Sequence, residues 1–375
     1  MNLFRCTCNE SPTLFFENTH CAACDRLVGF DPGSLKMKPF KPDPMLEGIW
    51  RDEAGAPFSK CVNWQQHNVC NWMVALPNSF EGSMDLSPPF CLACRCNLVI
   101  PDLSNNLNQI LWGRMEVAKR RCLYTLSALK LPFLDCPHLP ADLATLRFKF
   151  MNDKTPDSHF RRPIAGVPPV ITGHLNGTVT INLAEADDVA RTHTQSEMEE
   201  NYRTLLGHFR HETGHYYWSV FDRLDPGFAS RCRDTFGDER LDYTAALERY
   251  YATGPVENWQ ETFVSPYASA HPSEDWAECW SHYLHMLDTL ETHSSFSALL
   301  RGFESADSLT TEDIHSHRVS FDALMTRWMD MTVYLNGLNQ SMGMPDPYPF
   351  VLTVSVQAKI RCIHEEIDRA IDLLL

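Results

Sequence analysis

The sequence lacks three features that would direct a protein to a membrane or to nucleic acid. No apolar run approaches the roughly 18–20 residues that a membrane-spanning helix needs. The chain begins MNLFRCTCNE, without the apolar stretch of a secretory signal peptide. Basic residues are outnumbered, since 32 Lys and Arg stand against 48 Asp and Glu and the formal net charge is -16. We therefore expect a soluble cytoplasmic protein that does not bind a membrane. We also expect no binding of nucleic acid, because the negatively charged backbone of nucleic acid attracts basic protein surfaces.

The most basic short stretch is GRMEVAKRRC, at residues 113–122. It falls within residues 106–130, a segment with helical periodicity and strong helix formers. Because the stretch is short, we interpret it as the exposed face of a helix rather than as a nucleic-acid site.

Cysteine is abundant, with 14 residues in a chain of 375. The cytosol keeps thiols reduced, so cysteine pairs at short spacing in that compartment indicate metal sites rather than disulfides. Nine of the 14 cysteines lie before residue 97, which indicates a change of domain near residue 100. We predict a cysteine-rich zinc-ribbon domain at 1–104 and a second domain at 105–375.

The cysteines of the first part form two groups of four. The first group follows the pattern C-x-C and then C-x-x-C, which is typical of a tetrahedral four-thiolate zinc site. Its members are Cys6, Cys8, Cys21 and Cys24. The second group is Cys61, Cys70, Cys91 and Cys94. Four thiolates leave no open coordination position, so we expect two structural zinc ions here.

Several alternatives stay open for these cysteines. Cys96 or His67 can replace one member of the second group, and the two groups can exchange a pair. Iron suits a tetrahedron of thiolates as zinc does. The ribbon can hold a protein partner, present a substrate or only stabilise the N-terminus, and its sequence does not choose between these roles.

The remaining sequence predicts mostly helices and a small sheet, and therefore an α+β fold. Residues 146–151 and 170–186 have the composition of strands, and the second segment contains an Asn-Gly pair typical of a hairpin turn. Helices are predicted near 197–221, 239–252, 272–293, 310–336 and 351–374. The Pro-rich segment 36–48 cannot form a regular helix and is interpreted as a link.

Residues 205–218 read LLGHFRHETGHYYW. His211 and His215 stand four apart on one helix face, so both imidazoles can reach one metal ion. This is the H-E-x-x-H arrangement of zinc peptidases, in which zinc lowers the pKa of its water to about 7 and the carboxylate, here Glu212, takes the proton. The alternative interpretation is an amphipathic helix with two exposed histidines that bind no metal. Gly214 costs about 1 kcal/mol in a helix interior, which predicts close packing at that position.

A catalytic zinc ion needs a third protein ligand and an open fourth position. Residues 265–285 predict a helix that begins near Pro272. Glu274 and Glu278 lie four apart on one face of that helix. One can bind the metal while the other accepts a hydrogen bond from a ligand histidine, and the spacing does not say which.

The pair HETGH and Y-x6-E-x3-E resembles the gluzincin metallopeptidases, in particular those of the anthrax lethal factor type. The resemblance implies that Glu274 is the third ligand, that Glu278 holds a ligand histidine and that Tyr267 donates a hydrogen bond to the oxyanion. The whole chain also resembles bacterial proteins described as putative zinc-binding metallopeptidases with an N-terminal zinc ribbon. This resemblance implies a zincin-like metallopeptidase domain after the ribbon, and it specifies no substrate.

The leading hypothesis is a zinc-dependent hydrolase that cleaves an amide bond of a peptide or protein, with one catalytic and two structural zinc ions. The strand TVTINL at 178–183 is either an edge that an extended peptide can join or an ordinary core strand. A non-catalytic binding module on a zincin scaffold is a second hypothesis, although it gives Glu212 no role. A zinc amidase or deaminase acting on a small molecule is a third hypothesis. The sequence lacks the H-x-E…P-C-x-x-C signature of zinc deaminases, which counts against the deaminase.

Overall fold

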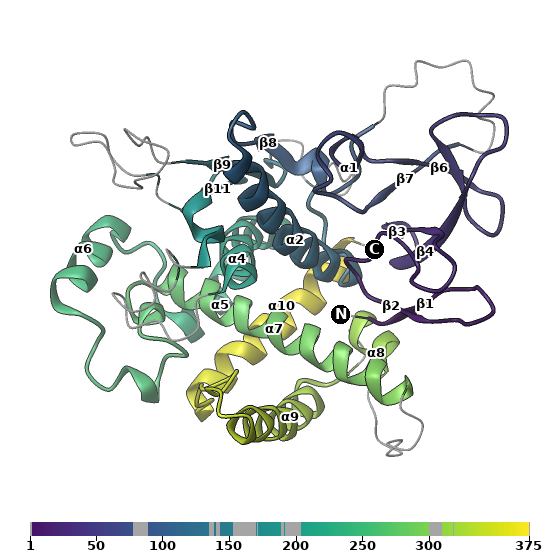
Figure 1. Cartoon of the computed structure of the whole chain (residues 1–375). Helices are drawn as coiled ribbons and strands as arrows, with labels where there is room; N and C mark the ends of the chain where they lie inside the picture. Colours follow the sequence, from purple (N-terminus) through teal and green to yellow (C-terminus); the bar gives the residue numbers. More distant parts are fainter. Residues whose placement is uncertain are drawn as a thin grey trace. The chain divides into compact units, whose positions relative to one another are not determined.

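The computed structural model of the chain describes residues 2–77, 89–134, 139, 143–152, 170, 172–188, 191, 204–299, 310–317 and 319–374. The chain folds into two compact units. The first comprises Met1–Ala128, Leu146–Gly173 and Thr178–Arg191, and the second Leu129–Thr145, His174–Gly177 and Thr192–Leu375. Strands dominate the beginning of the chain and helices its later part, so the predicted α+β class is confirmed (Figure 1).

The first unit begins with short antiparallel strands, drawn in purple in Figure 1. Strands β1 (Phe4–Arg5) and β2 (Thr13–Leu14) form a two-stranded ribbon. A five-stranded antiparallel sheet follows in the order β3-β4-β5-β6-β7. Its strands are β3 (Leu27–Asp31), β4 (Lys36–Pro42), β5 (Ile49–Arg51), β6 (Pro57–Lys60) and β7 (Met73–Ala75). The Pro-rich segment forms no helix, as expected, but most of it is strand β4 rather than a link.

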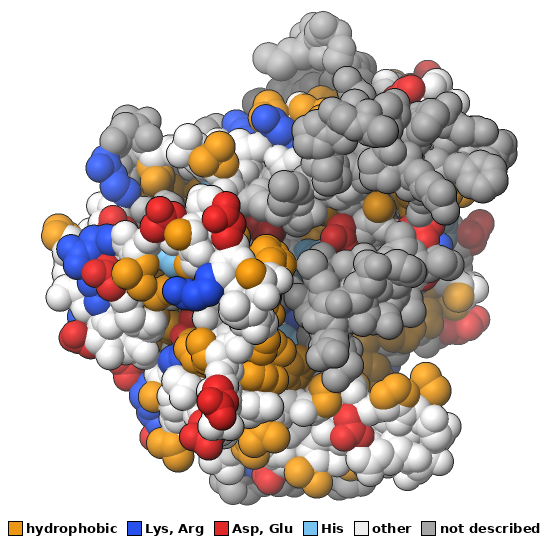
Figure 2. Space-filling view, turned by 90° about the vertical axis from the view of Figure 1, so that its left-hand side faces the viewer, with side chains coloured by type: hydrophobic (Ala, Val, Ile, Leu, Met, Phe, Trp, Pro, Cys, Tyr) orange, Lys and Arg blue, Asp and Glu red, His pale blue; other side chains and the backbone are white. Residues whose placement is uncertain are grey.

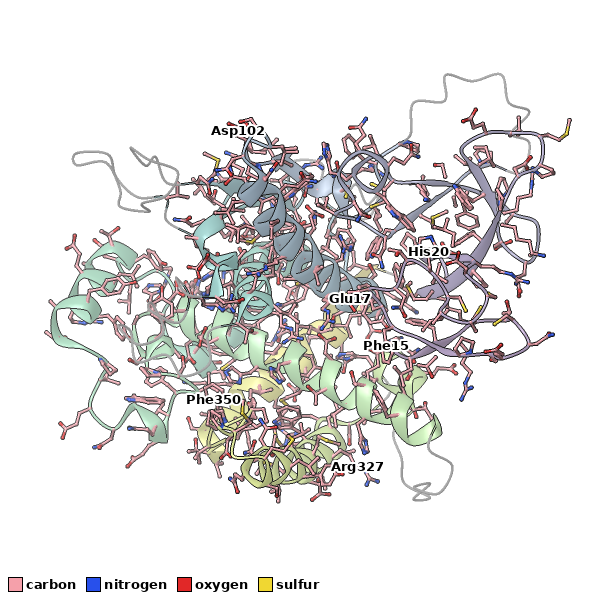
Figure 3. The ribbon with its side chains drawn as sticks, viewed as in Figure 1. Phe15, Glu17, His20, Asp102, Arg327 and Phe350 are labelled. Atoms are coloured by element: carbon pink, nitrogen blue, oxygen red, sulfur yellow. The ribbon has the colours of Figure 1, made fainter. Side chains whose placement is uncertain are left out.

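Helix α2 (Asn106–Ala128) confirms the helix predicted at 106–130 and carries much of the first unit's core. Tyr124 of α2 packs on Phe16 and Phe30, with ring centroids 5.4 and 5.8 Å apart. Glu17 accepts a hydrogen bond of 2.6 Å from Arg121, near the end of the same helix (Figure 3). The short helix α1 (Val62–His67), the 3-10 turn η1 (Cys94–Cys96) and strand β8 (Asn97–Val99) precede α2 in the sequence.

The interpretation of residues 113–122 as an exposed helix face holds for Arg114 and Arg121, whose side chains are 49% and 40% exposed, but is wrong for the other two basic residues. Lys119 is fully buried and Arg120 is 4% exposed. Burial of two cations requires compensating negative groups, and these are the carboxylate of Glu116 and the second cysteine group, described below.

A second sheet has the strand order β10-β11-β9-β8, with β9 at Arg147–Met151, β10 at Gly173–Leu175 and β11 at Thr178–Asn182. Asn176 and Gly177 have φ angles of 47° and 74°, as a tight hairpin turn requires, so the predicted hairpin is confirmed. Strand β11 pairs with β9 in parallel and has β10 as its other neighbour. It is therefore an inner strand, and of the two interpretations of residues 178–183 the ordinary core strand is the one observed. The 3-10 turn η2 (Leu183–Ala186) follows it.

The second unit is mostly helical. Its elements are α4 (Leu205–Leu224), α5 (Phe228–Phe236), α6 (Tyr243–Thr253), η3 (Trp259–Glu261), η4 (Tyr267–Ser269), α7 (Pro272–Leu299), α8 (Thr311–His315), α9 (Phe321–Ser341) and α10 (Val354–Leu374). The helices predicted near 239–252, 272–293 and 351–374 are confirmed, whereas α5 was not predicted. Residues 197–203 of the predicted histidine helix lie outside the described residues. Within the described part of the chain, no helix is both long and apolar enough to cross a membrane.

The helix predicted at 310–336 is divided into α8 and α9. Thr310 and Asp313 form a capping box at the start of α8. His317 has a left-handed φ of 54°, which ends the helical path. The hydroxyl of Ser320 then accepts from Ala323 N and starts α9. The sequence prediction of one helix at 310–336 therefore missed the second helix start, which is capped by Ser320.

Helices α4 and α7 pack closely where Gly214 faces α7. A Cβ atom on Gly214 would lie 3.0 Å from the Cα atom of Ala277 and 3.1 Å from the ring of Trp280. The indole of Trp276 donates a hydrogen bond of 2.9 Å to the Gly214 carbonyl. Trp280 also stacks on Tyr217, with ring centroids 4.9 Å apart. The predicted close packing at Gly214 is confirmed, and it fixes the face of α4 that meets α7.

Gly214→Ala should destabilise the protein although alanine is the better helix former. The added methyl group would meet the backbone of Ala277, and overpacking of this kind costs about 1–3 kcal/mol. Gly337→Ala is the matched control, because Gly337 lies in α9 with nothing within 4 Å of its missing Cβ. Denaturant unfolding of both variants measures the difference. Equal stability of the two variants would contradict the close packing of α4 on α7.

Candidate metal centre

Helices α4 and α7 bring two histidines and a glutamate together. His211 and His215 come from one face of α4, and Glu274 comes from the first turn of α7. The Nε2 atom of His211 lies 3.0 Å from Glu274 Oε2 and 3.3 Å from His215 Nε2, and His215 Nε2 lies 3.5 Å from Glu274 Oε1. These atoms converge as the ligands of one ion do.

The three side chains fit a zinc ion. Zinc bonds to imidazole nitrogen and carboxylate oxygen are about 2.0–2.2 Å long, so tetrahedral ligand atoms lie about 3.3–3.6 Å apart. The observed separations of 3.0–3.5 Å are close to this range. The side chains of His211 and His215 are 13% and 18% exposed and that of Glu274 is 1% exposed. Solvent therefore reaches the centre from the histidine side.

Glu278 contacts the His211 ring at Nδ1, the nitrogen that does not face Glu274 and His215. Its Oε1 atom lies 2.7 Å from His211 Nδ1, and its Oε2 atom accepts a hydrogen bond of 2.6 Å from the hydroxyl of Ser265. A carboxylate in this position fixes the orientation of an imidazole and leaves Nε2 free for a metal. Glu278 thus lies where the resemblance implied, one helical turn beyond Glu274. Ser265 was missed, because nothing in its local sequence indicates the contact.

Glu212 and Tyr267 both lie near the three converging side chains. Glu212 is 7% exposed and follows His211 directly in α4. The ring of Tyr267, in η4, lies 6.0 Å from that of His211. Burial and the negative charge of Glu274 raise the pKa of Tyr267 above its usual range, with a smaller contribution from Glu212. The phenol therefore keeps its proton at neutral pH and can donate a hydrogen bond.

Tyr243 is a site residue that sequence reasoning missed. Its hydroxyl donates a hydrogen bond of 2.6 Å to Glu274 Oε1. Partial burial and the carboxylate of Glu274 raise the pKa of Tyr243 above its usual range, so its hydroxyl remains a hydrogen-bond donor. The contact joins the start of α6 to the start of α7 across 31 residues of sequence, and no spacing rule links the two positions.

Opposing charges stabilise the centre. Burial alone would lower the pKa of His211, but the hydrogen bonds and charges of Glu274 and Glu278 raise it well above its usual value. Burial would raise the pKa of Glu274, whereas His215 and His211 lower it well below its usual value. The carboxylates thus stabilise positive charge at this point, whether a proton or a metal ion carries it.

The first cysteine group converges in the first unit. Cys6 and Cys24 have their sulfur atoms 3.8 Å apart, and those of Cys8 and Cys21 are 3.9 Å apart. Zinc–sulfur bonds of about 2.3 Å at tetrahedral angles place sulfur atoms about 3.8 Å apart. The four thiols predicted from C-x-C and C-x-x-C therefore fit a structural zinc ion.

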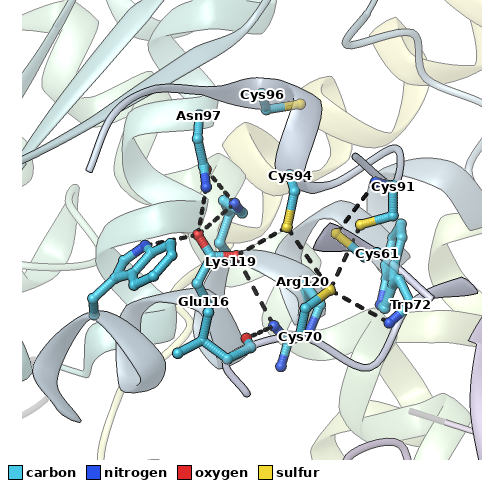
Figure 4. A network of polar contacts seen from close by, with 12 residues as sticks. Cys61, Cys70, Trp72, Cys91, Cys94, Cys96, Asn97, Glu116, Lys119 and Arg120 are labelled. Carbon is cyan, nitrogen blue, oxygen red and sulfur yellow. Dashed lines mark hydrogen bonds and ion pairs between the residues drawn. The ribbon is translucent and has the colours of Figure 1, made fainter. Parts of the chain in front are cut away.

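The second cysteine group converges in the same way (Figure 4). The sulfur of Cys70 lies 3.6 Å from that of Cys91 and 3.8 Å from that of Cys94. The backbone N–H groups of Trp72 and Cys91 donate to the sulfur atoms of Cys70 and Cys61, each at 3.4 Å. The two groups do not exchange members in the described structure.

Neither predicted substitute belongs to the second group as the described residues are arranged. The thiol of Cys96 points to the Leu92 carbonyl at 3.6 Å. The ring of His67 lies against Trp112, with ring centroids 5.6 Å apart.

Buried charges of α2 lie beside the second cysteine group (Figure 4). Glu116 Oε2 lies 3.8 Å from the sulfur of Cys94, and Glu116 Oε1 lies 2.8 Å from Lys119 Nζ. Arg120 donates a hydrogen bond of 2.5 Å to the Val69 carbonyl. Burial would lower the pKa of Arg120, but the nearby thiolates and Glu116 raise it. Two cations against one carboxylate leave positive charge beside the sulfur atoms, which explains why Lys119 and Arg120 are buried.

Substitution of Glu274 and Glu278 of α7 should separate their roles. Glu274→Ala should remove most of the metal at the histidine centre, because a carboxylate in contact with both Nε2 atoms is lost. Glu278→Ala should weaken metal binding by roughly 10–100-fold, the usual effect of losing a partner of a ligand histidine. Metal analysis of both proteins after dialysis measures the order. An empty site in Glu278→Ala together with a filled one in Glu274→Ala would reverse the assignment.

Two family matches cover nearly all of the chain. Residues 108–366 match the family described as "Putative zinc-binding metallo-peptidase", and residues 3–105 match a zinc-ribbon domain. The two matches divide between residues 105 and 108, whereas the first compact unit of the structure continues to Ala128, and the domain boundary at 104 stays a prediction. The likeness to the anthrax lethal factor type stays a prediction.

Relatives of similar length exist in mycobacteria. An uncharacterized protein of Mycobacterium bovis and two of Mycobacterium tuberculosis are each 36% identical to this chain over 370 residues, which is 98% of the chain and 96% of each relative. No solved structure matches the chain. The family match spans more than half of the sequence, and the chain therefore belongs to the family of putative zinc-binding metallopeptidases, with an N-terminal zinc ribbon.

Proposed function

We propose that the protein is a metallopeptidase that hydrolyses an amide bond of a peptide or protein at the centre formed by His211, His215 and Glu274. The convergence of these three side chains, with Glu212 directly after the first, is the observation that carries the proposal. Membership of a zinc-binding metallopeptidase family supports the reaction class. We further propose one catalytic zinc ion and two structural zinc ions at the cysteine groups.

The two histidines and Glu274 would hold the catalytic ion. Zinc bound there would supply a Lewis acid and lower the pKa of a water molecule to about 7. Glu278 keeps the ring of His211 oriented through Nδ1. The hydroxyl of Tyr243 donates a hydrogen bond to Glu274 Oε1 and so restricts the rotation of that carboxylate.

Glu212 is the general base of this proposal. It accepts a proton from the attacking water and delivers it to the leaving amine. The residue is only 7% exposed, so few bulk water molecules compete with the attacking water for the carboxylate. Tyr267 keeps its proton and donates a hydrogen bond to the carbonyl oxygen as negative charge develops there.

Apolar side chains around α6 support a peptide as substrate. Tyr243, Tyr251 and Val256 are 43%, 62% and 47% exposed. Tyr243 touches Glu274, and the neighbouring Tyr250 packs on Tyr267 with ring centroids 5.7 Å apart. Figure 2, which views the molecule from the side where α6 lies in Figure 1, shows apolar side chains among scattered charged ones. Side chains of a peptide could be buried against such a surface.

Glu212→Gln should keep the metal and lose turnover. The amide fills the same space and can bond to water, but it cannot accept a proton, and general acid–base catalysis is typically worth about 10²–10⁴-fold. Hydrolysis of a peptide library, followed by mass spectrometry, measures the rate. Glu257→Gln, at an exposed position, is the control for the charge change. Wild-type turnover in Glu212→Gln would exclude this mechanism.

Tyr267→Phe should lower kcat by about 10²–10³, the usual effect of losing one donor to an oxyanion. Metal content and KM should change little, because the phenol is neither a ligand nor the main contact of the bound peptide. Tyr334→Phe serves as control, since Tyr334 lies on α9 and is 61% exposed. A fall in zinc content with unchanged kcat per bound zinc would show that Tyr267 supports the fold instead.

A further inference from the structure

A second cluster of two histidines and a carboxylate lies elsewhere in the helical unit. His317 belongs to the connection between α8 and α9, and His364 and Asp368 lie four apart on α10. One ligand atom of each converges within 4.8 Å of the others. The donor set is therefore the same as at His211, His215 and Glu274. Neither the family matches nor the H-E-x-x-H pattern includes a role for this cluster.

Tyr283 of α7 orients both histidine rings. Its hydroxyl lies 2.8 Å from His317 Nε2 and 2.7 Å from His364 Nδ1. These contacts engage one nitrogen of each ring, so the other nitrogen of each ring faces Asp368. His317 Nδ1 is hydrogen-bonded to Asp368 Oδ1, and His364 Nε2 lies 3.6 Å from Asp368 Oδ2. The two rings stack with centroids 4.6 Å apart.

If both imidazoles are neutral, the cluster has one proton fewer than its contacts. Two neutral imidazoles and one hydroxyl carry three protons, whereas the rings make two contacts with Tyr283 and two with Asp368. One contact must therefore join two lone pairs. The separation of 3.6 Å between His364 Nε2 and Asp368 Oδ2 is too long for a hydrogen bond and identifies that contact. An added cation would complete the set.

The dimensions and the exposure fit a metal ion. Bonds of about 2.0–2.2 Å at tetrahedral angles place nitrogen and oxygen ligands about 3.3–3.6 Å apart, in agreement with the 3.6 Å observed. The side chains of His317 and His364 are 4% and 6% exposed, whereas Asp368 is 42% exposed. An ion can therefore enter beside Asp368 and keep one position open to water. The direct bond between His317 and Asp368 would be replaced by bonds to the ion.

We propose that His317, His364 and Asp368 form a further binding site for a divalent transition-metal ion, with zinc the best match to two imidazoles and a carboxylate. Tyr283 follows Glu274 by nine residues on α7, which is about 13 Å along a helix axis. Paired catalytic metals lie about 3.5–4 Å apart. The ion at Asp368 thus acts separately from the first centre, and it ties the connection between α8 and α9 to α10.

Asp368→Asn tests the site with little change of shape, and Asp372→Asn is the control one turn further along α10 at an exposed position. Full-length, zinc-containing protein is titrated with Zn²⁺, and native mass spectrometry counts the bound ions. Wild type and Asp372→Asn should bind one zinc ion more than Asp368→Asn at equal free zinc. Added zinc should also raise the Tm of the first two proteins and leave that of Asp368→Asn unchanged.

His364→Gln provides an independent variant, and circular dichroism checks the fold of each protein. It should lose the same single ion as Asp368→Asn while retaining the ions of the cysteine groups and of His211. Equal zinc counts in wild type, Asp368→Asn and His364→Gln would overturn the proposal. The cluster would then be a hydrogen-bonded network completed by a proton alone.

Discussion

The close contact between α4 and α7 at Gly214 is the constraint on which the candidate centre depends. Without a Cβ atom at this position, the backbone of Ala277 can approach α4 closely. The indole of Trp276 then bonds to the Gly214 carbonyl and sets the rotation of one helix against the other. The ligand face of α4 consequently meets Glu274 and Glu278, which precede and follow the contact on α7. Helix geometry sets the spacing of the side chains along each helix, and the glycine allows the side chains of α4 and α7 to come within bonding distance of one another.

Buried charge is stabilised in the same way in both parts of the chain. At the histidine centre, two carboxylates that are costly to bury are compensated by imidazoles that bind a proton or an ion. At the second cysteine group, thiolates are compensated by Lys119 and Arg120 of α2. Removal of one partner from such a set leaves the other buried and uncompensated, which costs about 3–5 kcal/mol. Metal binding and folding are therefore coupled at these positions.

The sequence predicts those parts of the site that depend on local geometry. His211 and His215 share a face because a helix repeats every 3.6 residues, and the same rule places Glu274 and Glu278 together. The four cysteines of each group were also found from their spacing and local grouping. The choice between Glu274 and Glu278 as the metal ligand came from a resemblance. Their spacing alone allows either one to bind the metal and the other to bond to a ligand histidine.

Contacts between distant segments could not be predicted from local patterns. Tyr243 reaches Glu274 only because α6 and α7 meet in space, and Tyr283 joins His317 to His364 across two helices. The burial of Lys119 and Arg120 depends on the cysteines beside them, so a basic helix stretch was interpreted as exposed. Strand β11 was interpreted as a possible edge, because alternating residues indicate a strand but do not reveal how many neighbours it has.

We propose that one zinc ion is bound by His211, His215 and Glu274, with Glu212 beside it as the acceptor of a proton from water. Anomalous X-ray diffraction from crystals of the full-length protein, recorded on both sides of the zinc absorption edge, tests it most directly. We expect a zinc peak bonded to Nε2 of both histidines and to Glu274, with Glu278 on His211 Nδ1 and Glu212 not bonded to the ion. A peak coordinated by Glu278 or Glu212 in place of Glu274, or no zinc between the two histidines, would contradict it.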